Sequence, residues 1–120
     1  MDNAYDLFRR GTALLAAGDH HAAILSLERA RDLEPEKSSV REALGRALFG
    51  ARRYRDASAE FAAVAAREPT NDYALFCLGR SLQLIGDHAG ARHPLALAAC
   101  LRPERSDYRR YLDQARRNAA

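Results

Sequence analysis

The sequence predicts an all-α fold, an α-solenoid in which three antiparallel helix pairs stack and a seventh helix covers the last pair. The chain matches itself when it is shifted by 34 residues, and a period of that length is typical of helical repeat arrays. Within the matching segments, apolar residues recur at helical spacing. Four residue types each occupy one repeat position in all three copies: Gly11, Gly45 and Gly79; Leu14, Leu48 and Leu82; Ala23, Ala57 and Ala91; Pro35, Pro69 and Pro103.

The whole chain, residues 1–120, is expected to form a single domain, as its length suggests. Each repeat should contain two helices, and one capping helix should follow the third repeat. The repeats are residues 4–37, 38–71 and 72–105. The expected helices lie at residues 4–17, 21–33, 38–50, 54–67, 71 or 72 to 85, 88–101 and 106–118.

Turn and cap residues mark the helix ends in repeats one and three. Glycine adopts the left-handed conformation that ends a helix, and aspartate caps the next helix. Gly18-Asp19 and Gly86-Asp87 should therefore separate the two helices of their repeats. Asn3 is expected to cap the first helix, and Asn71 or Asp72 the fifth. The proline column ends each second helix, because the residue before a proline is biased away from helical angles.

Repeat two and the sixth helix depart from this pattern. Repeat two has Arg52-Arg53 in place of the Gly-Asp turn, and Gly50 is expected to move the helix end two residues earlier. Ser38 and Ser39 are expected to cap its first helix. Pro94 lies inside the sixth helix, where a proline removes one backbone donor and crowds the carbonyl four residues earlier. A bend or an interruption is therefore expected near Pro94.

The glycine and alanine columns predict a close helix crossing in every repeat. Only a hydrogen atom is expected to fit between the backbones at the glycine, with the alanine as the opposing small residue and the leucine beside them. The close contact would offset the cost of glycine in a helix, about 1 kcal/mol. After the third repeat, Tyr108, Tyr111 and Leu112 are expected to cover its apolar face, because a stacked array needs a polar-backed terminal element.

The spacing Leu-Gly-x-x-Leu, then alanine, an apolar residue four positions later and proline resembles the tetratricopeptide repeat (TPR). The resemblance covers residues 4–105. It implies a right-handed superhelix of antiparallel helix pairs, and binding of proteins, often as an extended peptide or a helix, in a concave groove. Arg10 and Arg41 stand where the family prefers apolar residues, so these two positions are expected to be open to solvent.

The resemblance places the groove along the first helix of each pair. Mapped by repeat position, it takes these residues: Tyr5, Phe8, Arg9, Thr12 and Leu15 from repeat one; Ser39, Glu42, Ala43, Arg46 and Phe49 from repeat two; Tyr73, Phe76, Cys77, Arg80 and Gln83 from repeat three. One TPR subfamily grips the carboxylate end of chaperone tails with two lysines, two asparagines and an arginine. That clamp is absent, because its positions hold Phe8, Thr12, Ala43, Tyr73 and Cys77.

Aromatic and arginine side chains dominate the mapped groove. Arg46 and Arg80 share one repeat position and should stand one above the other. Arginine pairs with carboxylates and aromatic residues anchor interfaces, so the groove favours an acidic partner with apolar anchors. The alternative interpretation is that Phe8, Phe49 and Phe76 pack between neighbouring helices while the arginines are solvated.

The sequence contains no pattern of a catalytic, metal or cofactor site. The four histidines are expected to be solvated, since His88 and His93 are five residues apart and helical metal ligands are usually three or four apart. Acidic residues are spread over the helix faces as solvating charges. Cys77 and Cys100 have no ligand spacing and are expected to be reduced, partly buried thiols.

Charge and hydropathy indicate which other classes are not expected. The net charge of +3 comes without a basic stripe interleaved with aromatics, so nucleic-acid binding is not expected. No uncharged run exceeds nine residues, whereas a membrane span needs about 18 or more. The charged N-terminus does not read as a signal peptide. A cytoplasmic protein is expected, and the excess of arginine over lysine suggests a bacterial one.

Three functions remain open from the sequence. The leading one is a non-enzymatic module that binds a peptide or protein segment in the concave groove. The second is a self-associating scaffold in which arrays stack end to end or exchange capping helices. The third is a chaperone-like binder of secreted proteins, and it rests on resemblance of architecture alone.

Overall fold

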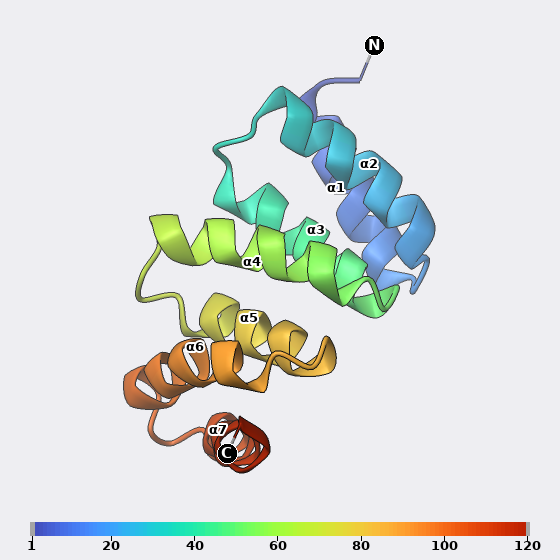
Figure 1. The fold of residues 1–120 in the computed structure, drawn as a ribbon. Helices are drawn as coiled ribbons and strands as arrows, with labels where there is room; N and C mark the ends of the chain where they lie inside the picture. The colour runs from blue at the N-terminus through green and yellow to red at the C-terminus, as the bar shows by residue number, and fades with distance from the viewer. Residues whose placement is uncertain (1, 120) are drawn as a thin grey trace.

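The computed structural model describes residues 2–119, and within that range the chain forms seven α-helices and no strand (Figure 1). The all-α prediction is therefore confirmed. Every helix end lies within one residue of the position expected from the sequence. The helices are α1 (Ala4–Ala16), α2 (His20–Leu33), α3 (Ser38–Gly50), α4 (Tyr54–Arg67), α5 (Asp72–Leu84), α6 (His88–Leu101) and α7 (Ser106–Ala119).

The helices stack in chain order as an α-solenoid. Consecutive helices pack as the pairs α1–α2, α3–α4 and α5–α6, each pair packs on the next, and α7 packs on α6. The array is elongated, 51 × 24 × 21 Å. Figure 1 shows α1 and α2 at one end of it and α7 at the other. Helices α1, α3 and α5 are the first helices of the three repeats. Helix α7 follows α6 in the position that the first helix of a fourth repeat would take.

The caps expected in repeats one and three are present. The side chain of Asn3 accepts a hydrogen bond from the backbone of Asp6 at 2.8 Å, and Asn71 caps α5 in the same way. Asp19 and Asp87 cap α2 and α6. The glycines before them take positive φ angles, 82° at Gly18 and 87° at Gly86. The chain therefore reverses direction at these two turns as the sequence indicates.

In repeat two the helices end where expected, but the turn and the caps differ from the expectation. Gly50 lies in the last turn of α3, and Arg52 takes the left-handed conformation instead, with φ 63°. Arg53, at the repeat position of Asp19 and Asp87, makes no side-chain cap to α4. Ser38 and Ser39 lie inside α3 behind Lys37, so the prediction that they cap this helix is wrong. This turn has the geometry of the other two without their residues.

The glycine column makes room for a large side chain rather than for an alanine. A Cβ added to Gly45 would lie 2.9 Å from the Phe61 ring, and the corresponding neighbours of Gly11 and Gly79 are Leu27 and Leu95. The expectation that the alanine column opposes the glycines is wrong on this point. The alanines are fully buried in the same core. Missing side chains on the first helix therefore let large apolar residues of the second helix reach its backbone.

The core continues from the repeats into α7. Tyr108 is buried with Leu75 and Ala98, while Leu112 and Ala115 of α7 pack with Leu95 and its neighbours. The face of α7 expected to seal the last repeat does so. Its most buried side chain, Tyr108, has no exposed surface.

Pro94 does not interrupt α6. The helix runs from His88 to Leu101, the same 14 residues as α2 and α4, with Pro94 buried inside it. The predicted interruption is therefore wrong. Gly90 occupies the position whose carbonyl a proline crowds, and it has no side chain. A bend at Pro94 stays a prediction.

A buried carboxylate joins three helices in repeats one and two. Glu60 of α4 is 6 % exposed and binds Arg31 of α2 at 2.8 Å and Arg41 of α3 at 3.0 Å. Arg41 also donates to the Pro35 carbonyl. Two expectations are thus corrected. Arg41 is half-buried rather than open to solvent, and Glu60 is buried rather than a solvated charge on a helix face. Arg10 is exposed as expected.

The two cysteine side chains differ in their exposure. Cys77 is half-buried and Cys100 is exposed, so only one of the two thiols is partly buried as expected. Among the described residues, no helix combines the length and the apolar character needed to cross a membrane.

Candidate functional site

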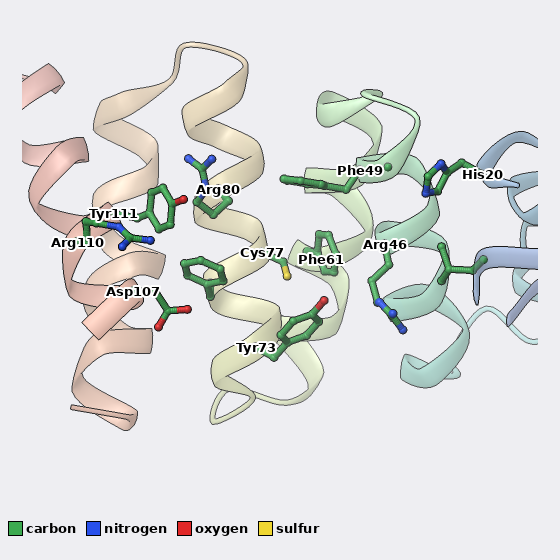
Figure 2. A pocket seen from close by; sticks show the side chains of 13 residues that line it. His20, Arg46, Phe49, Phe61, Tyr73, Cys77, Arg80, Asp107, Arg110 and Tyr111 are labelled. Carbon is green, nitrogen blue, oxygen red and sulfur yellow. The ribbon is translucent and has the colours of Figure 1, made fainter. Parts of the chain in front are cut away.

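A pocket of about 650 Å³, called the central pocket below, opens along the first helices of the repeats (Figure 2). Its walls come mainly from α3, α5 and α7. The lining residues are Leu15, His20, Arg46, Phe49, Gly50, Phe61, Tyr73, Phe76, Cys77, Arg80, Asp107, Arg110 and Tyr111. Seven of them belong to the groove mapped from the sequence: Leu15, Arg46, Phe49, Tyr73, Phe76, Cys77 and Arg80.

The repeat period explains why α7 takes part in the pocket. On α5, Tyr73, Phe76 and Cys77 line it, and a shift of 34 residues along the chain leads to three further lining residues on α7: Asp107, Arg110 and Tyr111. Helix α7 therefore presents side chains as the first helix of a fourth repeat would. Arg110 is exposed, as expected for a solvated arginine of α7, but it also lines the pocket, which the sequence reading did not anticipate.

The aromatic residues of the pocket pack between helices and also line it. Phe49 meets Tyr54 edge to face, with ring centroids 5.1 Å apart. Phe76 stacks on Tyr108 at 4.6 Å and leans on Tyr111 at 5.7 Å. Each is half-buried. Lining the groove and packing between neighbouring helices are therefore compatible for these residues. Because the rings are held rigidly, they can serve as anchors for a bound side chain.

The arginines of the pocket are in different states. The guanidinium of Arg80 lies 3.9 Å from the centroid of the Tyr111 ring and donates to Gln83 at 2.8 Å. Arg46 is exposed and makes no hydrogen bond or ion pair with any of residues 2–119. Although Arg46 and Arg80 share a repeat position, they are not an equivalent pair. Arg80 holds α7 against α5, whereas Arg46 faces the pocket without a partner.

Burial suppresses ionisation at the middle of the pocket. Burial raises the pKa of the Cys77 thiol to about 11, and burial together with the neighbouring Cys77 raises the pKa of Tyr73 to about 12. Figure 2 shows these two side chains next to each other on α5. Both are neutral at pH 7, so the centre of the pocket is uncharged and apolar.

His20 lies at the end of the pocket nearest repeat one. Its imidazole packs against Gly50, where a side chain would occupy the same space. The expectation that all four histidines are solvated is therefore wrong for His20, and His88 is also half-buried. A glycine at this one repeat position, where repeats one and three have Ala16 and Leu84, is the sequence signal that marks the contact.

The remaining mapped residues lie outside the central pocket. Tyr5 and Phe8 line a smaller hollow of about 180 Å³ between α1 and α3, and the Arg9 guanidinium lies 5.8 Å from the Tyr5 ring. Thr12 donates to a carbonyl of its own helix. Ser39 lines the same smaller hollow, and Ala43 is buried. Glu42 accepts a hydrogen bond from Asn71 at 3.2 Å, and Gln83 is buried and donates to the Tyr111 carbonyl at 2.9 Å.

Sequence reasoning missed the α7 wall and His20. The signal for the wall was available, because the 34-residue shift that maps α3 onto α5 also maps α5 onto α7. Among residues 2–119, no group of three or more His, Cys, Asp or Glu side chains is placed to hold a metal ion. The pocket therefore offers aromatic surface, guanidinium groups and one carboxylate.

A family model of the tetratricopeptide repeat matches residues 14–77, more than half of the chain. The chain belongs to the tetratricopeptide repeat family. TPR repeats generally form a non-enzymatic fold for protein interaction, and this TPR chain is a protein-interaction module. No match was found among curated proteins.

Solved structures share the fold of this TPR chain at low sequence identity. MamA from Desulfovibrio magneticus RS-1 is 23% identical with a TM-score of 0.89; 94% of this chain and 64% of that chain are covered. The Sgt2 TPR domain from Aspergillus fumigatus is 17% identical with a TM-score of 0.83, covering 97% and 78%. The first TPR of Spaghetti (RPAP3), bound to the HSP90 peptide SRMEEVD, is 16% identical with a TM-score of 0.87, covering 96% and 91%.

These likenesses confirm the fold predicted from the sequence. The TPR chain is an α-solenoid of antiparallel helix pairs in a right-handed superhelix. It spans less than two thirds of the MamA chain. At these identities the comparison concerns the fold and not the ligand.

Proposed function

We propose that this TPR chain binds a peptide segment of a partner protein in the central pocket. The observation that carries the proposal is the pocket itself, which is about 650 Å³ and is lined from three successive first helices. Its volume falls in the range of ligand sites and would take a few side chains of an extended segment. Aromatic and arginine side chains, which dominate its lining, are the types that contribute most to interface affinity.

The relative solved with a bound peptide supports peptide binding by this chain, but it does not support binding of the same peptide. The first TPR of RPAP3 is bound to an HSP90 peptide, so a domain of this fold binds a peptide. In the present chain the five clamp positions hold Phe8, Thr12, Ala43, Tyr73 and Cys77, none of them a cation. Ala43 is buried as well. We therefore propose a segment recognised by its side chains rather than by a terminal carboxylate.

The end faces of the array argue against the scaffold alternative. At α1, charged residues take the repeat positions that α3 fills with buried Val40, Ala43 and Leu44; they are Asp6, Arg9 and Arg10. At α7, charged residues take the positions of Leu75, Gly79 and Leu82; they are Arg109, Asp113 and Arg116. Burying these charges against another array would cost several kcal/mol. Light scattering at micromolar concentration should therefore report a monomer.

The test is a displayed library of short random peptides, panned on the purified protein. Binding of the enriched peptides is then measured by fluorescence anisotropy. Replacing Tyr73→Ala removes an accessible aromatic side chain from the pocket and should weaken binding about tenfold. Tyr5→Ala is the matched control, because Tyr5 is 64 % exposed and lies outside the central pocket.

Two results would contradict the proposal. One is a library from which no peptide is enriched. The other is an enriched set that binds the Tyr73→Ala variant as tightly as it binds the wild type. In the second case the convex surface of the array would become the better candidate.

A further inference from the structure

We infer that the central pocket recognises a segment in which two acidic side chains flank one aromatic or large aliphatic side chain. In this arrangement Arg46 of α3 pairs with one carboxylate and Arg110 of α7 with the other, and the apolar side chain enters between them beside Tyr73 and Phe76. The inference rests on the proposed function and specifies the chemistry of the ligand.

Arg46 and Arg110 are the two pocket arginines whose guanidinium groups have no hydrogen-bond or ion-pair partner among residues 2–119, whereas Arg80 donates to the side-chain amide of Gln83. Both are exposed, and neither forms an ion pair or a hydrogen bond in that range. The guanidinium carbon of Arg110 lies 5.1 Å from the centroid of the Tyr111 ring. Each guanidinium therefore keeps its donors for a bound carboxylate, which it can grip in a two-pronged fashion.

The other charged groups of the pocket are already engaged. Arg80 stacks on Tyr111 and donates to Gln83. Asp107, the only acidic residue of the lining, accepts two hydrogen bonds from Arg105, at 2.8 and 3.0 Å. Glu42 lies one turn before Arg46, outside the lining, and accepts from Asn71. The unpaired charge of the pocket is therefore positive, and it is divided between two walls.

The two arginines stand on opposite sides of an apolar centre. Figure 2 shows Arg46 and Arg110 on either side of Tyr73 and Cys77. The thiol and the phenol stay neutral, so a charged side chain that entered this centre would lose its hydration without gaining a charged partner. The centre therefore favours an apolar side chain. An acid–apolar–acid order in the ligand matches the arginine–apolar–arginine order of the pocket.

Helix spacing sets the expected distance between the two acidic residues. Helices α3, α5 and α7 are the first helices of successive repeats and touch one another little, so each lies at least the 8–10 Å of packed helices from the next and α3 and α7 are separated by roughly 20 Å or more. An extended chain rises about 3.3 Å per residue. At least roughly four to six residues would therefore separate the two carboxylates, once the reach of the arginine side chains is included.

The experiment uses fluorescein-labelled synthetic peptides with two glutamates at increasing separation and a central phenylalanine. Matched peptides carry lysine in place of both glutamates, or alanine in place of phenylalanine. Anisotropy titrations of the full chain should give the tightest binding for the glutamate–phenylalanine–glutamate series. Both matched series should bind at least about tenfold more weakly, because each lacks either the ion pairs or the apolar anchor.

Charge-reversed protein variants assign the two arginines. Arg46→Glu and Arg110→Glu should each weaken the acidic peptide about fivefold or more, and the double variant should prefer the lysine series. Arg109→Glu is the control on α7, since Arg109 carries the same charge on the same helix and does not line the pocket. Circular dichroism confirms that each variant is folded.

The outcomes separate this inference from the proposed function. Equal binding of the glutamate and lysine series, or unchanged binding by the double variant, would overturn the inference. It would also fall if library peptides that depend on Tyr73 proved neutral or basic, and in that case the proposed function would stand. Absence of binding by every acidic peptide would overturn it as well.

Discussion

The Tyr108 hydroxyl of α7 donates a hydrogen bond to Asp72 Oδ2 of α5 across 2.7 Å. The same ring stacks on Phe76 and lies beneath the Arg105 guanidinium, 4.5 Å from its centroid. Asp72 is in the first turn of α5, where a carboxylate interacts favourably with the helix dipole. A single side chain thus ties the last helix to repeat three and positions the α7 wall of the central pocket.

Replacing Tyr108→Phe should lower the free energy of unfolding by about 1–2 kcal/mol, because the ring remains and only the hydrogen bond to a carboxylate is lost. Urea denaturation at pH 8 measures the change. Tyr5→Phe is the control, since Tyr5 is largely exposed, and it should change the free energy of unfolding by less than about 0.5 kcal/mol. Equal effects of the two substitutions would contradict the assigned hydrogen bond.

The same hydrogen bond predicts sensitivity to alkaline pH. Burial and the Asp72 carboxylate raise the pKa of Tyr108 above its ordinary value of 10. The folded state therefore holds the phenol protonated, and its contribution to stability is complete below pH 10 and is lost as the pH rises beyond that value. In urea titrations between pH 8 and 11, the wild type should lose stability more steeply than Tyr108→Phe. Parallel curves would contradict the prediction.

Repairing the turn of repeat two should stabilise the protein. Arg52 has φ 63° at the repeat position of Gly18 and Gly86, and a non-glycine residue in this conformation costs roughly 1–2 kcal/mol. Arg52→Gly should therefore raise the free energy of unfolding by about 1 kcal/mol. Arg55→Gly, in the exposed part of α4, is the control and should lower it by about the same amount. A lower free energy of unfolding in Arg52→Gly would contradict the inference that the left-handed conformation strains the backbone at Arg52.

The buried carboxylate of Glu60 should be required for the packing of α2, α3 and α4. Glu60→Ala leaves Arg31 and Arg41 half-buried without their common partner, and we expect a loss of about 2–3 kcal/mol in the free energy of unfolding. Asp32→Ala is the control, because Asp32 is exposed and pairs only with Arg31 at the surface. Thermal denaturation would contradict this prediction if both variants melted with the wild type.

The two thiols should react at different rates. Burial raises the pKa of Cys77 to about 11, so its thiolate is scarce at pH 8, whereas Cys100 is exposed. Alkylation by iodoacetamide at pH 8, followed by mass spectrometry, should modify Cys100 at least about tenfold faster than Cys77. The difference should narrow as the pH approaches 11. A Cys100→Ser variant isolates the slow thiol, and rapid labelling of this variant at pH 8 would contradict its burial.

Local sequence signals were sufficient where neighbouring residues decide the structure. Gly18-Asp19 and Gly86-Asp87 give both the positive φ and the cap, so the turns could be read directly. The signals failed where distant residues decide. Arg52 takes the left-handed conformation because the helices on either side of it pack as in the other repeats, although nothing in its own side chain favours that conformation. The interior of α6 likewise accommodates Pro94.

The candidate site was predictable in part for the same reason. The repeat period places Arg46 and Arg80 on one face, because residues at equivalent positions of stacked helices face the same way. The period alone does not show which arginine is occupied. The Arg80 guanidinium stacks on the Tyr111 ring. Arg110, on the α7 wall of the pocket, takes the place of Arg80 as the second available arginine. Those differences arise between helices that are remote in sequence.

The sequence by itself determined the helices, their order and the face that carries the pocket, because a 34-residue period with glycine, alanine and proline columns repeats one local structure three times. The tertiary structure decided which side chains meet across the repeats: Leu27, Phe61 and Leu95 at the glycines, Glu60 between two arginines, and α7 as a wall of the pocket. These contacts depend on the distance and rotation between stacked helices, which packing sets and which no single segment of the sequence encodes.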